Sequence, residues 1–270
     1  MERALASTQG GTAGTVGVFR LLGVPIRLHF TFILLLIFLV VTDLGHDSSG
    51  VFALFILGLF ASVLLHEMAH ALVAQRFGVR TSEIVMFPIG GLSRMERALR
   101  PTEELWISLA GPGMNLLLAT LIFGYMAATH QGIHFKLDEL VELRDSNVFP
   151  RLGFANIILA VFNLLPAFPM DGGRVLRALL SYLRPEEEAT RMAAWMGRAL
   201  AISMGLYGLL APQFMLVFVA FFVYLGAAQE GAAAMGRSLT HGIPVRAAMI
   251  TRFEALGHGD TVREIGRAHV

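Results

Sequence analysis

Cysteine is absent from the 270-residue sequence, and charged residues make up only 15% of it. Without thiols the chain cannot form disulfides, zinc ribbons or thiolate nucleophiles, so any metal would have to be held by imidazole and carboxylate groups. The charges nearly cancel, to a net +1, which gives no argument for a nucleic-acid partner. Hydrophobic residues, in contrast, make up 55% of the chain, a balance that is rare in soluble globular domains. The composition therefore predicts a membrane protein in contact with lipid.

Long apolar runs divide the chain into about six candidate transmembrane helices, since a helix needs roughly 20 residues to cross the hydrocarbon core. The runs cover about residues 28–41, 51–77, 105–129, 148–165, 193–210 and 214–228. Gly111, Pro112 and Gly113 interrupt the third run, where we expect the helix to be broken. The sequence thus predicts an all-α polytopic membrane protein with about six transmembrane helices.

A short β segment is expected between the second and third runs. Residues 79–95 alternate between polar and apolar side chains, with the apolar ones before Gly90 and Gly91, which is typical of a short β element. Unpaired strand edges are not tolerated in lipid, so we expect this segment at the membrane interface. An unpaired edge there could receive another extended chain.

The arginines predict which loops face the cytoplasm, because cytoplasmic loops carry an excess of Lys and Arg. They occur before the first run, between the second and third, after the fourth and after the sixth: Arg3, Arg20, Arg27, Arg80, Arg94, Arg97, Arg100, Arg174, Arg177, Arg184, Arg191, Arg237 and Arg246. The intervening segments are acidic or neutral. We therefore expect a multi-pass protein of the plasma membrane with both termini cytoplasmic.

The sharpest chemical signal is His66-Glu67-Met68-Ala69-His70, inside the second apolar run. Residues four apart lie on one face of a helix, so both imidazoles can bind one metal with a carboxylate beside them. Catalytic zinc lowers the pKa of its bound water toward about 7, and a nearby carboxylate can then deprotonate that water. A chance pentapeptide is the alternative, but ionisable residues inside an apolar helix are unfavourable unless they form a polar site. The motif predicts one Zn2+ per chain, with His66 and His70 as ligands and Glu67 as general base.

The third ligand must come from another segment, and Asp171 is the best candidate. It follows the fourth apolar run after Pro166 and Pro169, and it precedes Gly172 and Gly173. This pattern predicts that a helix ends at the prolines and that the Asp is presented beside a glycine pair. On the local pattern alone, an ordinary turn Asp at a helix N-terminus fits equally well.

The segments His66 to His70 and Asn163 to Arg174 resemble, in order and spacing, the site-2 protease family of intramembrane zinc metalloproteases, of the peptidase M50 type. That family has HExxH in one transmembrane helix and an N-x-x-P-x-x-x-x-D-G-G type segment in a later one. The resemblance covers about residues 20–226 and implies that Asp171 is the third zinc ligand. It also implies a zinc metalloendopeptidase that hydrolyses peptide bonds of transmembrane protein substrates.

The resemblance extends to supporting residues. The segment Ala110-Gly111-Pro112-Gly113-Met114-Asn115 is similar to a G-P-x-x-N segment of the family, and Gly90-Gly91 is similar to its membrane-associated β segment. This implies polar support from Asn115 and Asn163, with contact to the substrate backbone near the metal. Hydrogen bonding between helices explains the two asparagines nearly as well.

Both ends of the chain lie outside the expected six-helix protease domain of residues 20–230. Residues 1–19 carry no secretory signal and are expected to form a disordered leader. Residues 231–270 are expected to form a cytoplasmic linker, followed by a stretch at 243–263 that looks like the truncated start of a CBS domain, a nucleotide-sensing module. Residues 264–270 can also be back-translated into a widely used sequencing adapter, so we expect the true reading frame to be cut short. Adenine-nucleotide regulation would then belong to the intact protein.

Hydrolysis requires a locally unwound substrate, and we hypothesise that pairing with residues 84–89 holds it extended.

Two other classes of protein also fit parts of the pattern. A metal transporter or channel places His and Asp within the membrane, but it needs no water-activating base, so Glu67→Gln would spare transport and abolish proteolysis. A catalytically silent scaffold is disfavoured because His66, Glu67, His70 and Asp171 are all present. The sequence decides neither the particular substrate nor the oligomeric state.

Overall fold

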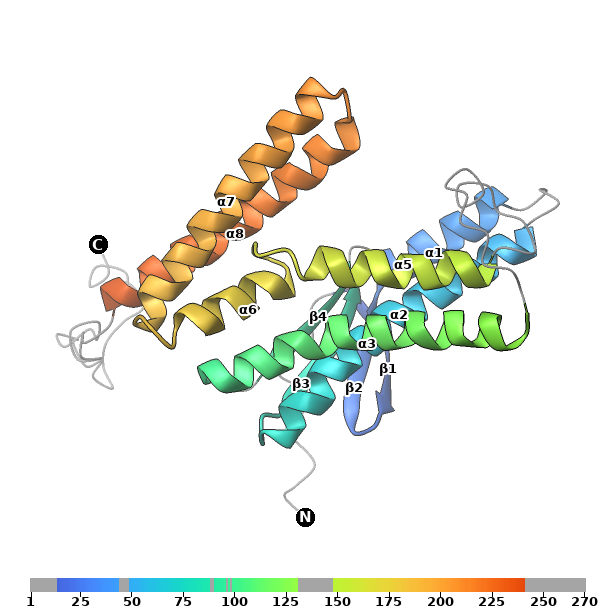
Figure 1. Cartoon of the computed structure of the whole chain (residues 1–270). Helices are drawn as coiled ribbons and strands as arrows, with labels where there is room; N and C mark the ends of the chain where they lie inside the picture. The colour runs from blue at the N-terminus through green and yellow to red at the C-terminus, as the bar shows by residue number, and fades with distance from the viewer. Residues whose placement is uncertain are drawn as a thin grey trace, which may run out of the picture.

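The computed structural model describes residues 14–43, 49–87, 90–95, 97, 99–130 and 148–240. Their elements are β1 (Thr15–Leu21), β2 (Val24–His29), α1 (Phe30–Asp43), α2 (Ser49–Arg76), β3 (Thr81–Phe87), β4 (Gly90–Met95), α3 (Pro101–Ala128), α5 (Val148–Asn163), α6 (Asp171–Leu180), α7 (Glu186–Leu210) and α8 (Phe214–Thr240). Helices α2, α3 and α5 lie side by side, and the long pair of α7 and α8 extends away from them (Figure 1). The short helix α6 connects these two parts of the chain (Figure 1).

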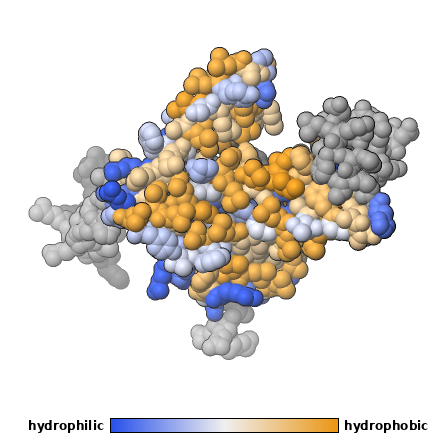
Figure 2. Space-filling model, viewed as in Figure 1, coloured by the Kyte–Doolittle hydropathy of each residue, from blue (hydrophilic) through white to orange (hydrophobic). Residues whose placement is uncertain are grey.

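Four of the described helices, α2, α3, α7 and α8, are long and apolar enough to cross a membrane. The other two predicted spans are shorter apolar helices: α1 has 14 residues and α5 has 16. The first run is shortened because residues 28 and 29 belong to β2, and the fourth because α5 ends at Asn163 before Pro166. The all-α polytopic class is therefore confirmed, but six full-length spans are not found among the described residues. Hydrophobic side chains cover much of the visible surface, including the outer part of the α7–α8 pair (Figure 2).

Helix α3 runs from Pro101 to Ala128 with Pro112 inside it, so the predicted break in this helix is wrong. An internal proline removes one backbone donor, and membrane helices tolerate this where neighbouring helices pack against them. Gly111 and Pro112 are both buried. The small residues in the middle of α3 therefore allow a close helix contact.

The β segment is larger than the sequence indicated. Strands β3 and β4 lie within the expected segment and form an antiparallel hairpin. They are joined by β1 and β2, giving a sheet in the order β1-β2-β3-β4 in which β2 and β3 run parallel. The expected disordered leader is therefore wrong for residues 15–19, which lie in β1, while residues 1–13 lie outside the described part of the chain.

The sheet packs against α2 and fixes how that helix is turned. Ile26 of β2 pairs with Ile84 of β3, and both are fully buried. They form one hydrophobic cluster with Met68 and Ala71 of α2. Because Met68 and Ala71 face the sheet, the neighbouring residues His66 and His70 are turned toward α3.

Strand β3 is paired on both sides, with β2 and with β4. The hypothesis that residues 84–89 receive a substrate strand is therefore wrong for the part in β3, and residues 88 and 89 are not described. The outer edge of β4 has no partner strand among the described residues. An incoming chain could therefore extend the sheet only at β4 or at β1.

The predicted linker and CBS-like stretch of residues 231–270 lie largely outside the described part of the chain. Helix α8 continues to Thr240, so the first residues of the expected linker are helical. The CBS-like stretch at 243–263 and residues 264–270 are not described.

Candidate metal centre

Helix α2 presents His66 and His70 on the face opposite its contact with the sheet. Each residue is only 6% exposed. The apolar residues that precede them make this stretch a buried or membrane-spanning helix, in which the four-residue spacing aligns the two rings. The sequence-predicted pair of imidazoles is therefore brought together at one buried position.

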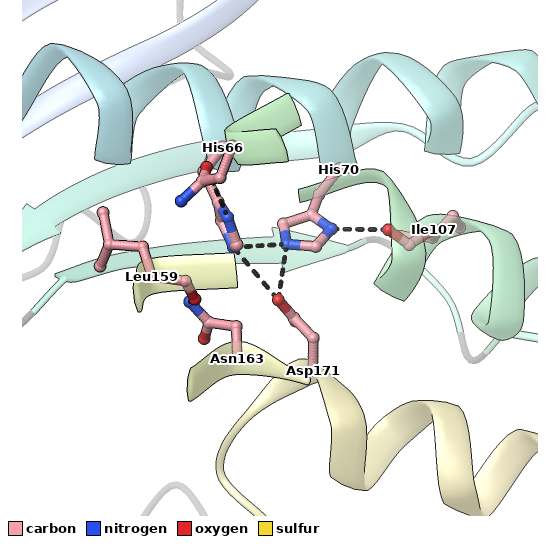
Figure 3. A network of polar contacts seen from close by, with 7 residues as sticks. His66, His70, Ile107, Leu159, Asn163 and Asp171 are labelled. Carbon is pink, nitrogen blue, oxygen red and sulfur yellow. Dashed lines mark hydrogen bonds and ion pairs between the residues drawn. The ribbon is translucent and has the colours of Figure 1, made fainter. Parts of the chain in front are cut away.

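Asp171 meets these two imidazoles from helix α6. The His66 Nε2 and His70 Nε2 atoms are 3.1 Å apart, and Asp171 Oδ2 lies 3.1 Å from the first and 3.2 Å from the second (Figure 3). The three atoms thus form a nearly equilateral triangle. The structure brings together all three predicted ligands, which lie up to 105 residues apart in the sequence.

Hydrogen bonds on the far sides of the rings fix which nitrogens carry protons. His70 Nδ1 lies 2.6 Å from the carbonyl oxygen of Ile107, which can only accept, so Nδ1 is the donor (Figure 3). His66 Nδ1 donates in the same way to Asn115 Oδ1 at 3.2 Å. In the neutral rings both Nε2 atoms therefore direct lone pairs toward the Asp171 carboxylate.

This triangle fits a zinc ion. Three lone-pair atoms at such short distances repel one another unless a cation lies between them. In a tetrahedral site with bonds of about 2.0–2.1 Å, ligand atoms lie about 3.3 Å apart, close to the distances found here. Two imidazoles and one carboxylate also leave the fourth position open, as catalytic zinc sites require. His66, His70 and Asp171 are the metal-binding group found among the described residues.

Asp171 reaches the histidines because the chain folds tightly before it. Helix α5 ends at Asn163, the proline-containing loop follows, and Asp171 is the first residue of α6. A Cβ atom on Gly172 would overlap with the backbone of Leu164 and Leu165, and one on Gly173 with the backbone of Ala167 and Phe168. The glycine pair therefore lets the loop lie directly against the first turn of α6.

An ion pair fixes the other end of α6 to α3. Arg177 donates from Nε to Glu104 Oε2 at 3.1 Å, and a second, closer contact joins its Nη2 to Glu104 Oε1. Glu104 is 5% exposed, and the Arg177 guanidinium lies 5.5 Å from the Phe168 ring centre. Burial lowers the pKa of Arg177, but the contacts with Glu104 outweigh burial and raise it above its ordinary value. Arg177 therefore stays charged and ties α6, which begins with Asp171, to α3.

Two residues of α3 lie against the histidines. A Cβ atom on Gly111 would overlap with the Nε2 atoms of both His66 and His70, so only glycine leaves this space free. Asn115 is 1% exposed, and its Nδ2 is buried without a hydrogen-bond partner among the described residues. The amide group therefore accepts from His66 and keeps a free donor close to the triangle.

Glu67 lies beside the triangle in a cavity of about 870 Å3. The cavity is also lined by His66, His70, Asn115, Asn163 and Asp171, by Gly91 of β4, and by Phe218 and Phe222 of α8. A Cβ atom on Gly91 would overlap with the Glu67 side chain. Gly91 therefore lets β4 approach the carboxylate.

Asn163 reaches the cavity but is not bonded to the triangle. Its Nδ2 donates to the Leu159 carbonyl oxygen at 3.0 Å, one turn earlier in α5 (Figure 3). Asn163 is the last residue of α5, and it lines the cavity together with Asp171.

Three features of the site were missed from the sequence. Gly111 was noted within a family-like segment but not as a residue in contact with both histidines, although a small residue in an apolar helix signals close packing. The Glu104–Arg177 pair was visible only as two charges near the ends of apolar runs. The Ile107 carbonyl had no side-chain signal at all, because it is a backbone group.

Comparisons with known proteins agree with this geometry. The model of the family described as "Peptidase family M50" matches residues 54–204. A zinc metalloprotease of Methanocaldococcus jannaschii is 39% identical over 223 residues, which cover 80% of this chain and 60% of the relative. Stage IV sporulation protein FB of Bacillus subtilis is 32% identical over 139 residues, covering 51% of this chain and 44% of the relative. The chain thus spans between about two fifths and three fifths of the length of these two relatives.

A solved structure is also similar. The site-2 protease from Methanocaldococcus jannaschii superposes with a TM-score of 0.57 at 32% sequence identity, covering 90% of this chain and 99% of that one. The likeness therefore extends beyond the two motifs to most of the described helices.

Proposed function

This chain belongs to peptidase family M50, and we propose that it is an intramembrane zinc metalloendopeptidase that hydrolyses peptide bonds of membrane-embedded proteins. The observation that carries the proposal is the triangle of His66 Nε2, His70 Nε2 and Asp171 Oδ2, with Glu67 beside it, in a cavity among apolar helices. A structural cluster of histidines would need neither an acidic third member nor an adjacent carboxylate facing a cavity.

In this proposal His66, His70 and Asp171 hold one Zn2+. When bound, zinc supplies a water of lowered pKa and a Lewis acid for the scissile carbonyl group. Glu67 would act as a general base toward water and then, with the proton it has taken, as a general acid toward the leaving amine. The apolar side chains of the cavity exclude other water, which strengthens the electrostatic interactions of these groups.

Supporting roles are proposed for four further residues. Asn115 holds His66 in the tautomer that directs Nε2 at the ligand triangle, and its unpaired Nδ2 can donate to a substrate carbonyl. Asn163 lines the same cavity and can contact substrate backbone. Gly90 and Gly91 begin β4, and the absence of a side chain at Gly91 leaves room for Glu67. The unpaired edge of β4 is the place where we propose that an unwound substrate extends the sheet.

The position in the membrane follows from the charges of the loops. We propose a multi-pass protein of the plasma membrane with both termini cytoplasmic and with the site nearer the cytoplasmic side. From His66 to the end of α2 at Arg76 is ten residues, or about 15 Å at 1.5 Å per residue.

We also propose nucleotide regulation through an intact CBS domain, on the basis of residues 243–263 alone.

Removing the metal tests the proposal. Purified protein in detergent is expected to contain about one zinc per chain and to cleave a generic transmembrane substrate. Treatment with a chelator should abolish cleavage, and added Zn2+ should restore it. His66→Ala should lose both zinc and cleavage. Metal transport by reconstituted wild-type protein that persists in Glu67→Gln, without any proteolysis, would instead identify a transporter.

A further inference from the structure

Helix α7 carries two arginines and a tryptophan on one face, and none of the three lines the cavity of the metal centre. Arg191, Trp195 and Arg198 are spaced by four and three residues, which places them on the same side of a helix. With Met192 and Met196 they line a depression of about 480 Å3. No acidic side chain is among these lining residues, so the depression combines apolar surface with two positive charges.

Most of this face is exposed, whereas Arg198 is half-buried. Trp195 is 64% exposed, Met192 42% and Met196 41%. The opposite face, with Ala193, Ala194 and Gly197, is buried against neighbouring elements. Because α7 is one of the helices able to cross a membrane, its outward face is expected to meet lipid. Tryptophan in such a helix is typical of the level of the lipid headgroups.

The two arginines have no protein partner among the described residues. The Nε atom of Arg198 is buried and has no hydrogen-bond acceptor there. The neighbouring Arg177 and Arg184, in contrast, are paired with Glu104 and Glu188. A guanidinium inside an apolar helix is unfavourable unless an anion or water satisfies it. The Arg198 guanidinium is therefore open to an anionic partner from outside the described protein.

We propose that this face binds the phosphate group of an anionic phospholipid from the leaflet that surrounds the N-terminal half of α7. The side chain of Arg198 leans toward the helix N-terminus and can reach the headgroup level, where Arg191 lies about 10 Å away along the helix. Guanidinium groups bind phosphate oxygens through paired hydrogen bonds. Trp195 and the two methionines supply apolar surface for the glycerol and the upper acyl chains.

Native mass spectrometry of the detergent-purified full chain tests this site, which does not depend on the proposed peptidase activity. Phosphatidylglycerol and phosphatidylcholine with identical acyl chains are titrated into the wild type, Arg198→Gln and Arg184→Gln. Arg184→Gln is the matched control, because Arg184 is exposed near the same end of α7 and lies outside the depression. Inorganic phosphate alone is titrated as a further arm, to separate a lipid site from a simple anion site.

The wild type should retain phosphatidylglycerol about tenfold more tightly than Arg198→Gln does, because a charge-assisted hydrogen bond is lost. Arg184→Gln should match the wild type, and inorganic phosphate should not compete. Equal retention of both lipids by the wild type, or an equal loss in both variants, would overturn the proposal. Competition by inorganic phosphate would replace the lipid site with an anion site.

A measurement on the wild type alone protects the test against misfolding of a variant. The melting temperature of the wild type should rise with phosphatidylglycerol more than with phosphatidylcholine, since a ligand stabilises the folded state it binds. No difference between the two lipids would also overturn the proposal.

Discussion

At the residue scale, the metal centre depends on two positions without a side chain as much as on the ligands themselves. Gly111 of α3 faces both histidine Nε2 atoms, and Gly91 of β4 faces Glu67. Any side chain at either position would occupy the space of the two imidazoles or of the Glu67 side chain. Asn115 and the Ile107 carbonyl complete the centre by fixing the tautomers of the two rings.

Gly111→Ala is expected to weaken zinc binding. The added Cβ atom would overlap with His66 Nε2 and His70 Nε2, so at least one ring must move from its position in the triangle. Displacing a ligand in this way should lower zinc affinity by about 10- to 100-fold or more, as measured by competition with a chromogenic chelator.

Gly113→Ala is the matched control, because it lies two residues away in the same helix and a Cβ atom there meets nothing within 4 Å. Its zinc affinity should equal that of the wild type. If both variants bind zinc as the wild type does, the contact of Gly111 with the ligands is not needed for the site.

At the scale of single elements, α6 holds the centre together. Its first residue supplies Asp171, its glycine pair lets the preceding loop pack closely, and Arg177 fixes it to α3. The guanidinium also lies near Glu230 of α8, at 4.0 Å between Nη1 and Oε2. The position of the third ligand thus depends on contacts with two other helices.

Glu104→Gln should shift α6 and weaken the centre indirectly. Removing one partner of a buried ion pair costs about 3–5 kcal/mol, because the other charge is left without compensation. We expect a lower melting temperature and weaker zinc binding. Glu188→Gln, which breaks the exposed pair with Arg184, should change neither, since exposed pairs contribute about 0–1 kcal/mol.

An unchanged zinc affinity in Glu104→Gln, together with a lower melting temperature, would show that the ion pair stabilises the fold without positioning Asp171. The double variant Glu104→Gln, Arg177→Met separates these effects further, because it removes both charges of the buried pair.

Most of the helices were predictable from the sequence, because each of these extends over a long run of apolar residues. The apolar runs predicted the helices, and the spacing of His66 and His70 predicted two ligands on one face. Local pattern did not reveal that residues 15–29 form two strands, because strands of six or seven residues depend on partners elsewhere in the chain. The uninterrupted course of α3 through Pro112 was missed for a related reason: packing by neighbouring helices outweighs the preference of proline to end a helix. The local pattern made Asp171 a candidate third ligand but fitted an ordinary turn Asp equally well. The family resemblance favoured the ligand, because the approach of Asp171 to the histidines depends on how α6 packs.

At the scale of the whole molecule, the remaining question is how the helices lie in the membrane. The loops with excess arginine predict that the segment between α6 and α7 is cytoplasmic and that the turn between α7 and α8 is on the other side. The α7–α8 pair extends away from helices α2, α3 and α5 (Figure 1).

The absence of native cysteine makes this topology easy to test by labelling. Single cysteines are introduced as Arg184→Cys, before α7, and Gln213→Cys, in the turn before α8; both sites are exposed. A membrane-impermeant maleimide added to intact cells should label Gln213→Cys only, and both variants should react after lysis. The reverse pattern in intact cells would invert the proposed topology.

The most direct test of the central claim compares the zinc content and peptide-bond cleavage of the wild type with those of Glu67→Gln. Glu67 is not one of the three metal ligands, so both proteins are expected to hold about one zinc per chain. Loss of the general base should slow cleavage of a transmembrane substrate by about 10²- to 10⁴-fold. Cleavage at the wild-type rate by zinc-loaded Glu67→Gln would contradict the account.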